Sequence, residues 1–264
     1  MSLGLDARQR AMLEEMGVRV WWPEAEPAAP LCAEPVPLPA SPASPTAPDF
    51  IAAPAQPVRA VDPKLLENRP QLQPLPAGLA TMDWPALRSA VAGCQACALC
   101  AGRKNAVPGA GGAPADWLIV GDAPDENEDL QGQPFVGPAG QLLDNMLKAL
   151  KLDRQQVYLS HALKCRPPAN RSPSPDEVAQ CEPYLRRQVE LLRPRIILAM
   201  GRFAVQSLLQ TTEPLGKLRG RVHRYHGVPV VVSYPPAYLL RSGADKAKAW
   251  ADLCLAQDVL KPAA

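Results

Sequence analysis

Cysteines with regular spacing are the first residues in this chain that could do chemistry. Cys94, Cys97 and Cys100 stand three apart in "CQACALC", and Cys165 and Cys181 follow further along the chain. Thiolates gathered in this way are typical of a four-ligand site for zinc or for a [4Fe–4S] cluster, and the spacing does not choose between the two. Disulfides are a poor explanation for the grouping, because thiols in a cytoplasmic protein stay reduced.

An acidic loop is the second candidate for chemistry. The stretch "GDAPDENEDLQGQPFVGPAG", residues 121–140, directly follows the apolar run "WLIV". A short apolar run of this kind indicates a buried strand, so the loop is expected at the end of that strand. Asp122 and Glu128 are carboxylates that could activate water there. The stretch therefore has the character of an active-site loop.

The elements that must position these residues alternate from about residue 83 onward. Strands are predicted at 116–122, 155–163, 195–201 and 228–236, and helices at 84–93, 139–152, 174–194, from 202 to Leu209, and at 243–260. This order predicts a three-layer α/β/α fold around a mostly parallel sheet. The site of such a sheet lies at the carboxyl ends of the strands, which here carry Asp122, His161, Gly201 and Tyr234.

Composition divides the 264 residues into two parts. Of the 32 prolines, 15 lie between residues 23 and 76, so residues 23–82 are predicted to be a disordered Pro/Ala-rich linker before a globular domain at 83–264. Residues 86–264 carry 22 basic and 16 acidic side chains, a net charge of +6 that is compatible with DNA binding. No apolar run reaches membrane-spanning length and no signal peptide opens the chain, so we expect a cytoplasmic protein with no membrane partner.

A separate N-terminal segment, residues 1–22, carries a short amphipathic pattern. Its apolar side chains Leu13, Met16, Trp21 and Trp22 could bind a partner protein's groove. The alternative is that this segment packs on its own globular domain.

Several ordered blocks of the chain resemble the family 4 uracil-DNA glycosylases, which carry an iron–sulfur cluster. The resemblance covers about residues 90–260 and rests on "CQACALCAGRKNAVPG", "GDAPDENEDLQGQPFVGPAGQLL", "VYLSHALKCRPPANRSPSPDEVAQCEPYL", "LLRPRIILAMG", "KLRG" and "PPAYLLR". It implies the α/β fold of that family and a [4Fe–4S] cluster held by Cys94, Cys97, Cys165 and Cys181. Cys100 matches no ligand of the family.

The same resemblance assigns roles around a base pocket. Phe135 matches the ring on which uracil stacks, and Asp122 and Glu128 are the catalytic candidates if the protein is active. The remaining pocket positions are Ala123, Asp125, His161 and Pro235, and the positions implied to contact DNA are Arg219, Tyr238, Leu239 and Arg241.

Three pocket positions depart from the family pattern. His161 replaces an asparagine whose amide reads uracil, and an imidazole cannot present a donor and an acceptor side by side. Pro235 replaces a histidine and has no donor for a developing anion. Asp125 replaces a glycine that allows the base to approach closely. The sequence thus predicts that little or no glycosylase activity remains.

Two functions follow from these features. The N-terminal segment resembles the start of the psi subunit of the bacterial DNA polymerase III clamp-loader assembly. The interpretation favoured by the sequence is therefore a replication accessory subunit on a disused glycosylase fold, bound to a chi-like subunit and to clamp-loader subunits. The alternative is an active or divergent family 4 uracil-DNA glycosylase that acts in base excision repair.

Overall fold

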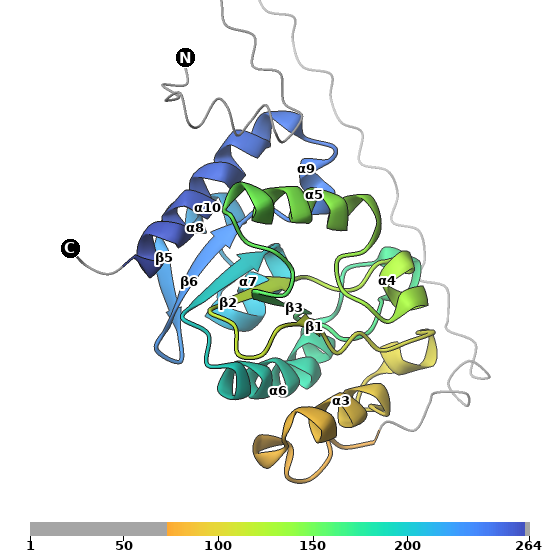
Figure 1. The fold of residues 1–264 in the computed structure, drawn as a ribbon. Helices are drawn as coiled ribbons and strands as arrows, with labels where there is room; N and C mark the ends of the chain where they lie inside the picture. The colour runs from red at the N-terminus through yellow and green to blue at the C-terminus, as the bar shows by residue number, and fades with distance from the viewer. Residues whose placement is uncertain (1–72, 262–264) are drawn as a thin grey trace, which may run out of the picture. The chain divides into compact units, whose positions relative to one another are not determined.

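The computed structural model describes residues 73–261, whose core is one six-stranded sheet with the order β1-β3-β2-β4-β6-β5 (Figure 1). The four inner strands are parallel and the two edge strands are antiparallel to their neighbours. The strands are β1 (Ala110–Gly111), β2 (Trp117–Gly121), β3 (Val157–His161), β4 (Ile196–Met200), β5 (Val222–Tyr225) and β6 (Val228–Ser233). The predicted α/β fold with a mostly parallel sheet is confirmed.

The three central strands are buried along their whole length. Every residue of β2, β3 and β4 is buried, as expected for parallel strands that are covered on both faces. Their register places Gly121 opposite both His161 and Met200, so the three strands end side by side. This common edge positions the residues that follow each strand.

Two helical layers cover the sheet (Figure 1). The helices α5 (Gly137–Ala149) and α10 (Lys246–Leu260) share one apolar cluster with one face of the sheet. The helices α6 (Pro175–Leu192) and α7 (Arg202–Leu209) share another with the opposite face. Ser174 and Glu177 form the predicted capping box at the start of α6.

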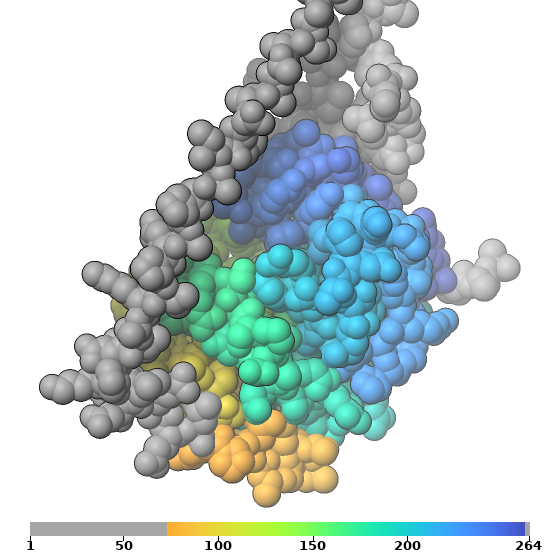
Figure 2. Space-filling view, turned by 180° about the vertical axis from the view of Figure 1, so that it is seen from behind, coloured from red at the N-terminus to blue at the C-terminus, as the bar shows by residue number. Residues whose placement is uncertain are grey.

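Shorter elements complete the domain. The helix α3 (Trp84–Ala92) packs on α6, as the orange and green-to-teal regions in Figures 1 and 2 show. The others are α4 (Glu126–Gln131), α8 (Leu215–Leu218), α9 (Pro236–Leu239), η1 (Leu79–Thr81), η2 (Ala98–Ala101), η3 (Pro168–Asn170) and η4 (Gly243–Asp245). No helix in the described part of the chain is long and apolar enough to span a membrane.

The last ten residues of the predicted linker, 73–82, pack on the domain instead. Leu79 is buried, and Arg187 Nε of α6 donates a hydrogen bond of 2.7 Å to the carbonyl oxygen of Met82. The globular domain therefore includes residues that the proline content of this region had assigned to the linker. The predicted partner-binding residues of segment 1–22 lie outside the described residues.

Candidate active site

A cavity of about 260 Å³ opens at the carboxyl ends of β2, β3 and β4, and we call it the cleft. The register of the strands explains its position, because the loops after β2, β3 and β4 start from one edge of the sheet. Its lining residues are Gly121, Asp122, Ala123, Asp125, Glu128, Phe135, Ala139, His161, Met200, Pro235, Pro236, Ala237, Tyr238 and Arg241. The acidic loop, His161 and Pro235, chosen from the sequence, therefore meet in one place.

Glu128 and His161 form a buried pair in the cleft. His161 Nε2 lies 3.1 Å from Glu128 Oε1. The same carboxylate accepts hydrogen bonds from the backbone N–H groups of Asp125, at 2.7 Å, and Phe135. Burial alone would raise the pKa of Glu128, but His161 and these backbone donors hold it below its ordinary value. Glu128 is thus kept as a carboxylate.

The ring of His161 also packs against Phe135. The two ring centroids lie 4.7 Å apart with an interplanar angle of 34°. His161 Nδ1 is buried without a hydrogen-bond partner, and it faces Gly121, where an added Cβ would lie 2.5 Å from it. The two residues that the imidazole nitrogens face, Glu128 and Gly121, both line the cleft. Because an imidazole does not present a donor and an acceptor side by side, His161 cannot replace an asparagine amide as the reader of a base edge.

Asp122 caps a helix from outside that helix. Its Oδ1 accepts hydrogen bonds from the backbone N–H groups of Phe203, at 2.8 Å, and Ala204, at 2.9 Å, at the start of α7. Burial raises the pKa of Asp122, and the two backbone donors oppose that rise. A Cβ at Gly201 would lie 2.3 Å from this carboxylate, so the position requires glycine. Both bonds go to Oδ1.

Asp125 is directed to a helix end rather than into the space for a base. It is the N-cap of α4, and its side chain accepts a 2.9 Å hydrogen bond from the backbone N–H of Glu128 in a capping box. The backbone N–H groups of a helix start stabilise a carboxylate. Asp125 therefore lines the cleft while its carboxylate is bound to the start of α4.

The cysteines form a second group beneath α3 and α6. Cys97, Cys165 and Cys181 are buried in one apolar cluster, and Cys94 and Cys97 both act electrostatically on the pKa of Cys165. Burial raises the pKa of Cys165 to about 11 and that of Cys181 to about 12. Arg103 Nη1 donates a 2.9 Å hydrogen bond to Cys165 Sγ.

The thiols are not arranged as a ready metal-binding site. Within residues 73–261, no three histidine, cysteine or acidic side chains are grouped closely enough to hold a metal ion. The chemistry of the donors nevertheless fits a thiolate-bound centre, because three thiols share one buried region and the guanidinium of Arg103 donates to one of them. Metal binding lowers the pKa of a coordinating thiol, which would offset the effect of burial.

A family model described as the uracil DNA glycosylase superfamily matches residues 108–254. The chain belongs to the uracil-DNA glycosylase superfamily. Among its relatives, a type-4 uracil-DNA glycosylase of Saccharolobus solfataricus is 44% identical over 156 residues, which are 56% of this chain and 72% of the relative. The type-4 enzyme of Archaeoglobus fulgidus is 42% identical over 56% of this chain and 78% of its own length. The type-4 enzyme of Pyrobaculum aerophilum is 40% identical over 66% of this chain and 93% of its own length.

These relatives correct the favoured interpretation of the sequence. Five proteins that are 37–44% identical to the chain are named type-4 uracil-DNA glycosylases, so the replication accessory subunit is wrong. The error came from giving a short N-terminal resemblance more weight than the domain. The family match, 108–254, does not include that N-terminal segment.

Two residues that the resemblance assigned to DNA contact make contacts within the domain. Arg219 pairs with Asp252 at 2.7 Å, and its guanidinium lies 4.3 Å from the ring centre of Tyr234. Leu239 is fully buried, whereas the next residue, Leu240, is 49% exposed. The rotation of the short helix α9 about its axis determines which of the two leucines is exposed, and the sequence alone does not show that rotation.

The other predicted positions of the glycosylase cleft lie on its wall. Ala123, Pro235 and Arg241 line it, and so does Tyr238, whose hydroxyl donates a 2.6 Å hydrogen bond to Asp245. Gly201 and Tyr234, expected from the strand ends, do not line it. Met200 and Ala139 do, and the sequence analysis missed them. Met200 ends β4 directly beside Gly121, so an exact strand register would have identified it.

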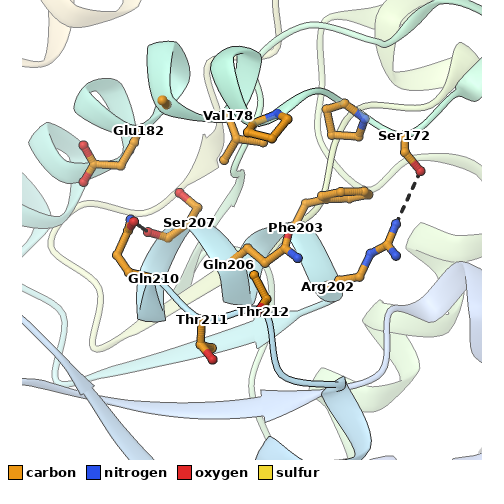
Figure 3. A pocket seen from close by; sticks show the side chains of 13 residues that line it. Ser172, Val178, Glu182, Arg202, Phe203, Gln206, Ser207, Gln210, Thr211 and Thr212 are labelled. Carbon is orange, nitrogen blue, oxygen red and sulfur yellow. Dashed lines mark hydrogen bonds between the residues drawn. The ribbon is translucent and has the colours of Figure 1, made fainter.

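A larger cavity of about 700 Å³ lies between α6 and α7, outside the cleft (Figure 3). Phe203 and Val178 face it, and Arg202 donates a 3.3 Å hydrogen bond to Ser172 at its rim. Its carboxylate, Glu182, accepts a 2.9 Å hydrogen bond from Tyr225. The buried hydroxyl of Ser207 is sealed from solvent. The smaller cleft is the candidate active site, because Asp122, the Glu128–His161 pair and Phe135 line it.

Proposed function

We propose that the protein is a DNA N-glycosylase that hydrolyses the bond between uracil and deoxyribose, at a lower rate than its type-4 relatives. The observation that carries this proposal is the cleft, where Phe135, Glu128 and Asp122 meet at the carboxyl ends of β2 and β3. Glycosylases act on a base that has left the helical stack, and a pocket of this size accommodates one flipped base.

Phe135, Glu128 and Asp122 each have a defined part in the proposed reaction. Phe135 provides a flat apolar face for the base, and Glu128 holds Phe135 and His161 in place through its hydrogen bonds. Asp122 Oδ2 accepts a proton from the attacking water. The C1′–N1 bond breaks, its electron pair leaves with the uracil, and the water oxygen bonds to C1′.

The leaving anion receives little support from this cleft. Pro235 has no donor, and the imidazole of His161 is paired with Glu128. Among the lining residues, Arg241 is the cation that could stabilise an anion, and this residue is exposed. Losing one preorganised donor raises a barrier by about 2.7–4 kcal/mol, which explains why a slow enzyme is proposed.

We further propose that Cys94, Cys97, Cys165 and Cys181 hold a [4Fe–4S] cluster. Such a cluster would tie together the segment after α3, the turn after β3 and the middle of α6, and its role would be structural. The burial of three of these thiols and the hydrogen bond from Arg103 to Cys165 support this proposal.

Single-turnover cleavage tests the proposed activity. The full chain is incubated with an end-labelled single-stranded oligonucleotide that carries one deoxyuridine, and alkali then cuts the strand at abasic sites. We expect slow cleavage at that position and none in a matched oligonucleotide with thymidine. The Asp122→Asn variant should lose the cleavage. Complete lack of product from the full chain at high enzyme concentration would refute the proposal.

A further inference from the structure

Lys164 is a buried cation that the proposed reaction does not use. It lies in the turn after β3, is 2% exposed, and its side chain folds back along the strand. Its ammonium group donates to Ser160 Oγ at 2.7 Å, to the carbonyl oxygen of His161 at 2.6 Å and to Gln188 Oε1 at 2.8 Å. A buried polar group is tolerated when its hydrogen bonds are made, and the side-chain nitrogen of Lys164 has three acceptors.

The bond to His161 satisfies a carbonyl group that the sheet leaves open. The edge strand β1 pairs with Tyr158 and Leu159, and it does not extend as far as His161. On the other side, β2 pairs through Gly121, whose carbonyl oxygen accepts from the N–H of Ala162. Buried backbone oxygens need a donor, and Lys164 supplies one where the β1 strand has ended.

Two anchors therefore hold His161. Lys164 fixes its backbone from one side, and Glu128 fixes its imidazole from the other, at 3.1 Å. Glu128 also binds the backbone of Phe135. A shift in the end of β3 would move the imidazole against both Glu128 and Phe135, which are the groups that shape the cleft.

The network on the far side of Lys164 reaches the cysteine region. Gln188 of α6 donates through Nε2 to the carbonyl oxygen of Pro108, and the N–H of Val107 donates to the carbonyl oxygen of Lys164 at 2.8 Å. The next residue in the chain is Cys165, and Cys181 stands two helical turns before Gln188 on the same face of α6. Lys164 thus lies between the thiols and the cleft.

We propose that Lys164 is a positioning residue that fixes the end of β3, and with it His161, against Glu128 and Phe135. It does so without touching the substrate. The kinetic part of this inference rests on the proposed glycosylase function, and the structural part does not.

The Lys164→Met variant of the full chain tests the proposal, because methionine fills a similar volume and removes the donor. The chain has three histidines, so the imidazole ¹⁵N–¹H resonances of His161 are easily distinguished from those of His223 and His226. We expect the His161 resonances to move and those of the other two to stay. We also expect kcat/KM for the deoxyuridine oligonucleotide to fall by up to about 100-fold, the loss that a shift of about 1 Å in the groups lining a site can cause.

Two variants serve as controls. Ser160→Ala removes another acceptor of the same ammonium and keeps its bond to His161. Leu185→Ala removes a fully buried side chain from α6, and it is chosen to lower stability as Lys164→Met does without changing the contact to His161. Both should leave the His161 resonances in place. Unmoved resonances in Lys164→Met, or the same movement in Leu185→Ala, would overturn the positioning role. If the resonances move as expected but the unaltered chain cleaves no oligonucleotide, the proposed function fails and the positioning role stands.

Discussion

The imidazole of His161 pairs with Glu128 in the cleft, and it cannot present a donor and an acceptor side by side as an amide does. The sequence indicated that an amide was missing at this position, and this much could be derived from residue types alone. The sealed Nδ1 could not, because it depends on how the ring packs between Gly121 and Phe135. Asp125 shows the same limit, since only the structure reveals that its carboxylate caps α4.

Restoring both missing groups should raise the rate of uracil excision. In the double variant His161→Asn, Pro235→His, an amide faces the base and an imidazole faces the leaving anion. Because each such donor lowers the barrier by about 2.7–4 kcal/mol, we expect a gain of about 100-fold or more in the single-turnover rate. The control is Pro235→Ala, which removes the proline ring and adds no donor. An equal gain in that control would show that space, rather than a donor, limits the enzyme.

At the scale of elements, the end of β4 and the start of α7 depend on one glycine. Gly201 has a φ of 127°, a conformation that L side chains rarely adopt, and a Cβ there would meet the Asp122 carboxylate. Gly201→Ala should therefore destabilise the fold by about 3 kcal/mol or more, since it adds backbone strain and displaces the carboxylate that caps α7. Urea unfolding followed by circular dichroism measures this loss.

Gly216 in α8 provides the matched control. A Cβ at this position meets nothing within 4 Å, and no positive φ is required. Gly216→Ala is expected to leave stability unchanged or to raise it by up to about 1 kcal/mol, because alanine favours a helix. A loss in Gly201→Ala no greater than in this control would contradict the account of the α7 cap.

The inner strands, which the sequence predicted, and the edge strands, which it did not, are stabilised in different ways. The inner strands were predicted because their continuous apolar runs record burial on both faces. The edge strands β1 and β5 were not. β1 has two residues, and β5 reads "VHRY" with a mostly accessible surface, so neither carries an apolar pattern. β1 pairs with Tyr158 and Leu159, which are distant in sequence, and β5 pairs with the adjacent β6 across a tight turn, so backbone hydrogen bonds rather than apolar side chains define both strands.

For the molecule as a whole, the cysteine group is expected to link three separate segments through iron. The anaerobically purified chain should be brown and contain iron. Cys181→Ser should lose the colour and unfold at a lower temperature, because a bound metal centre contributes to folding free energy. Cys100→Ser should keep both properties, since Cys100 matches no family ligand. Visible absorption and iron content measure the outcome, and stoichiometric zinc without iron would exclude the cluster.

Residues 73–82 set the boundary of the folded domain, and truncation should show it. Every residue lining the cleft lies between 121 and 241, so a chain that starts at residue 73 should keep its excision rate. A chain that starts at 83 loses the buried Leu79 and the hydrogen bond from Arg187 to Met82. Burial of one leucine contributes about 1.5–3 kcal/mol, so its unfolding midpoint in urea should fall clearly.

Comparing the two truncations with the full chain also decides between the two interpretations of the N-terminal segment. If that segment packs on its own domain, the chain that starts at 73 will already be less stable than the full chain. If it binds elsewhere, those two will unfold together, and stability will be lost only when residues 73–82 are removed. Under either interpretation the removal of residues 73–82 should lower stability, because Leu79 and Met82 belong to the apolar cluster that includes Leu87 and Tyr184.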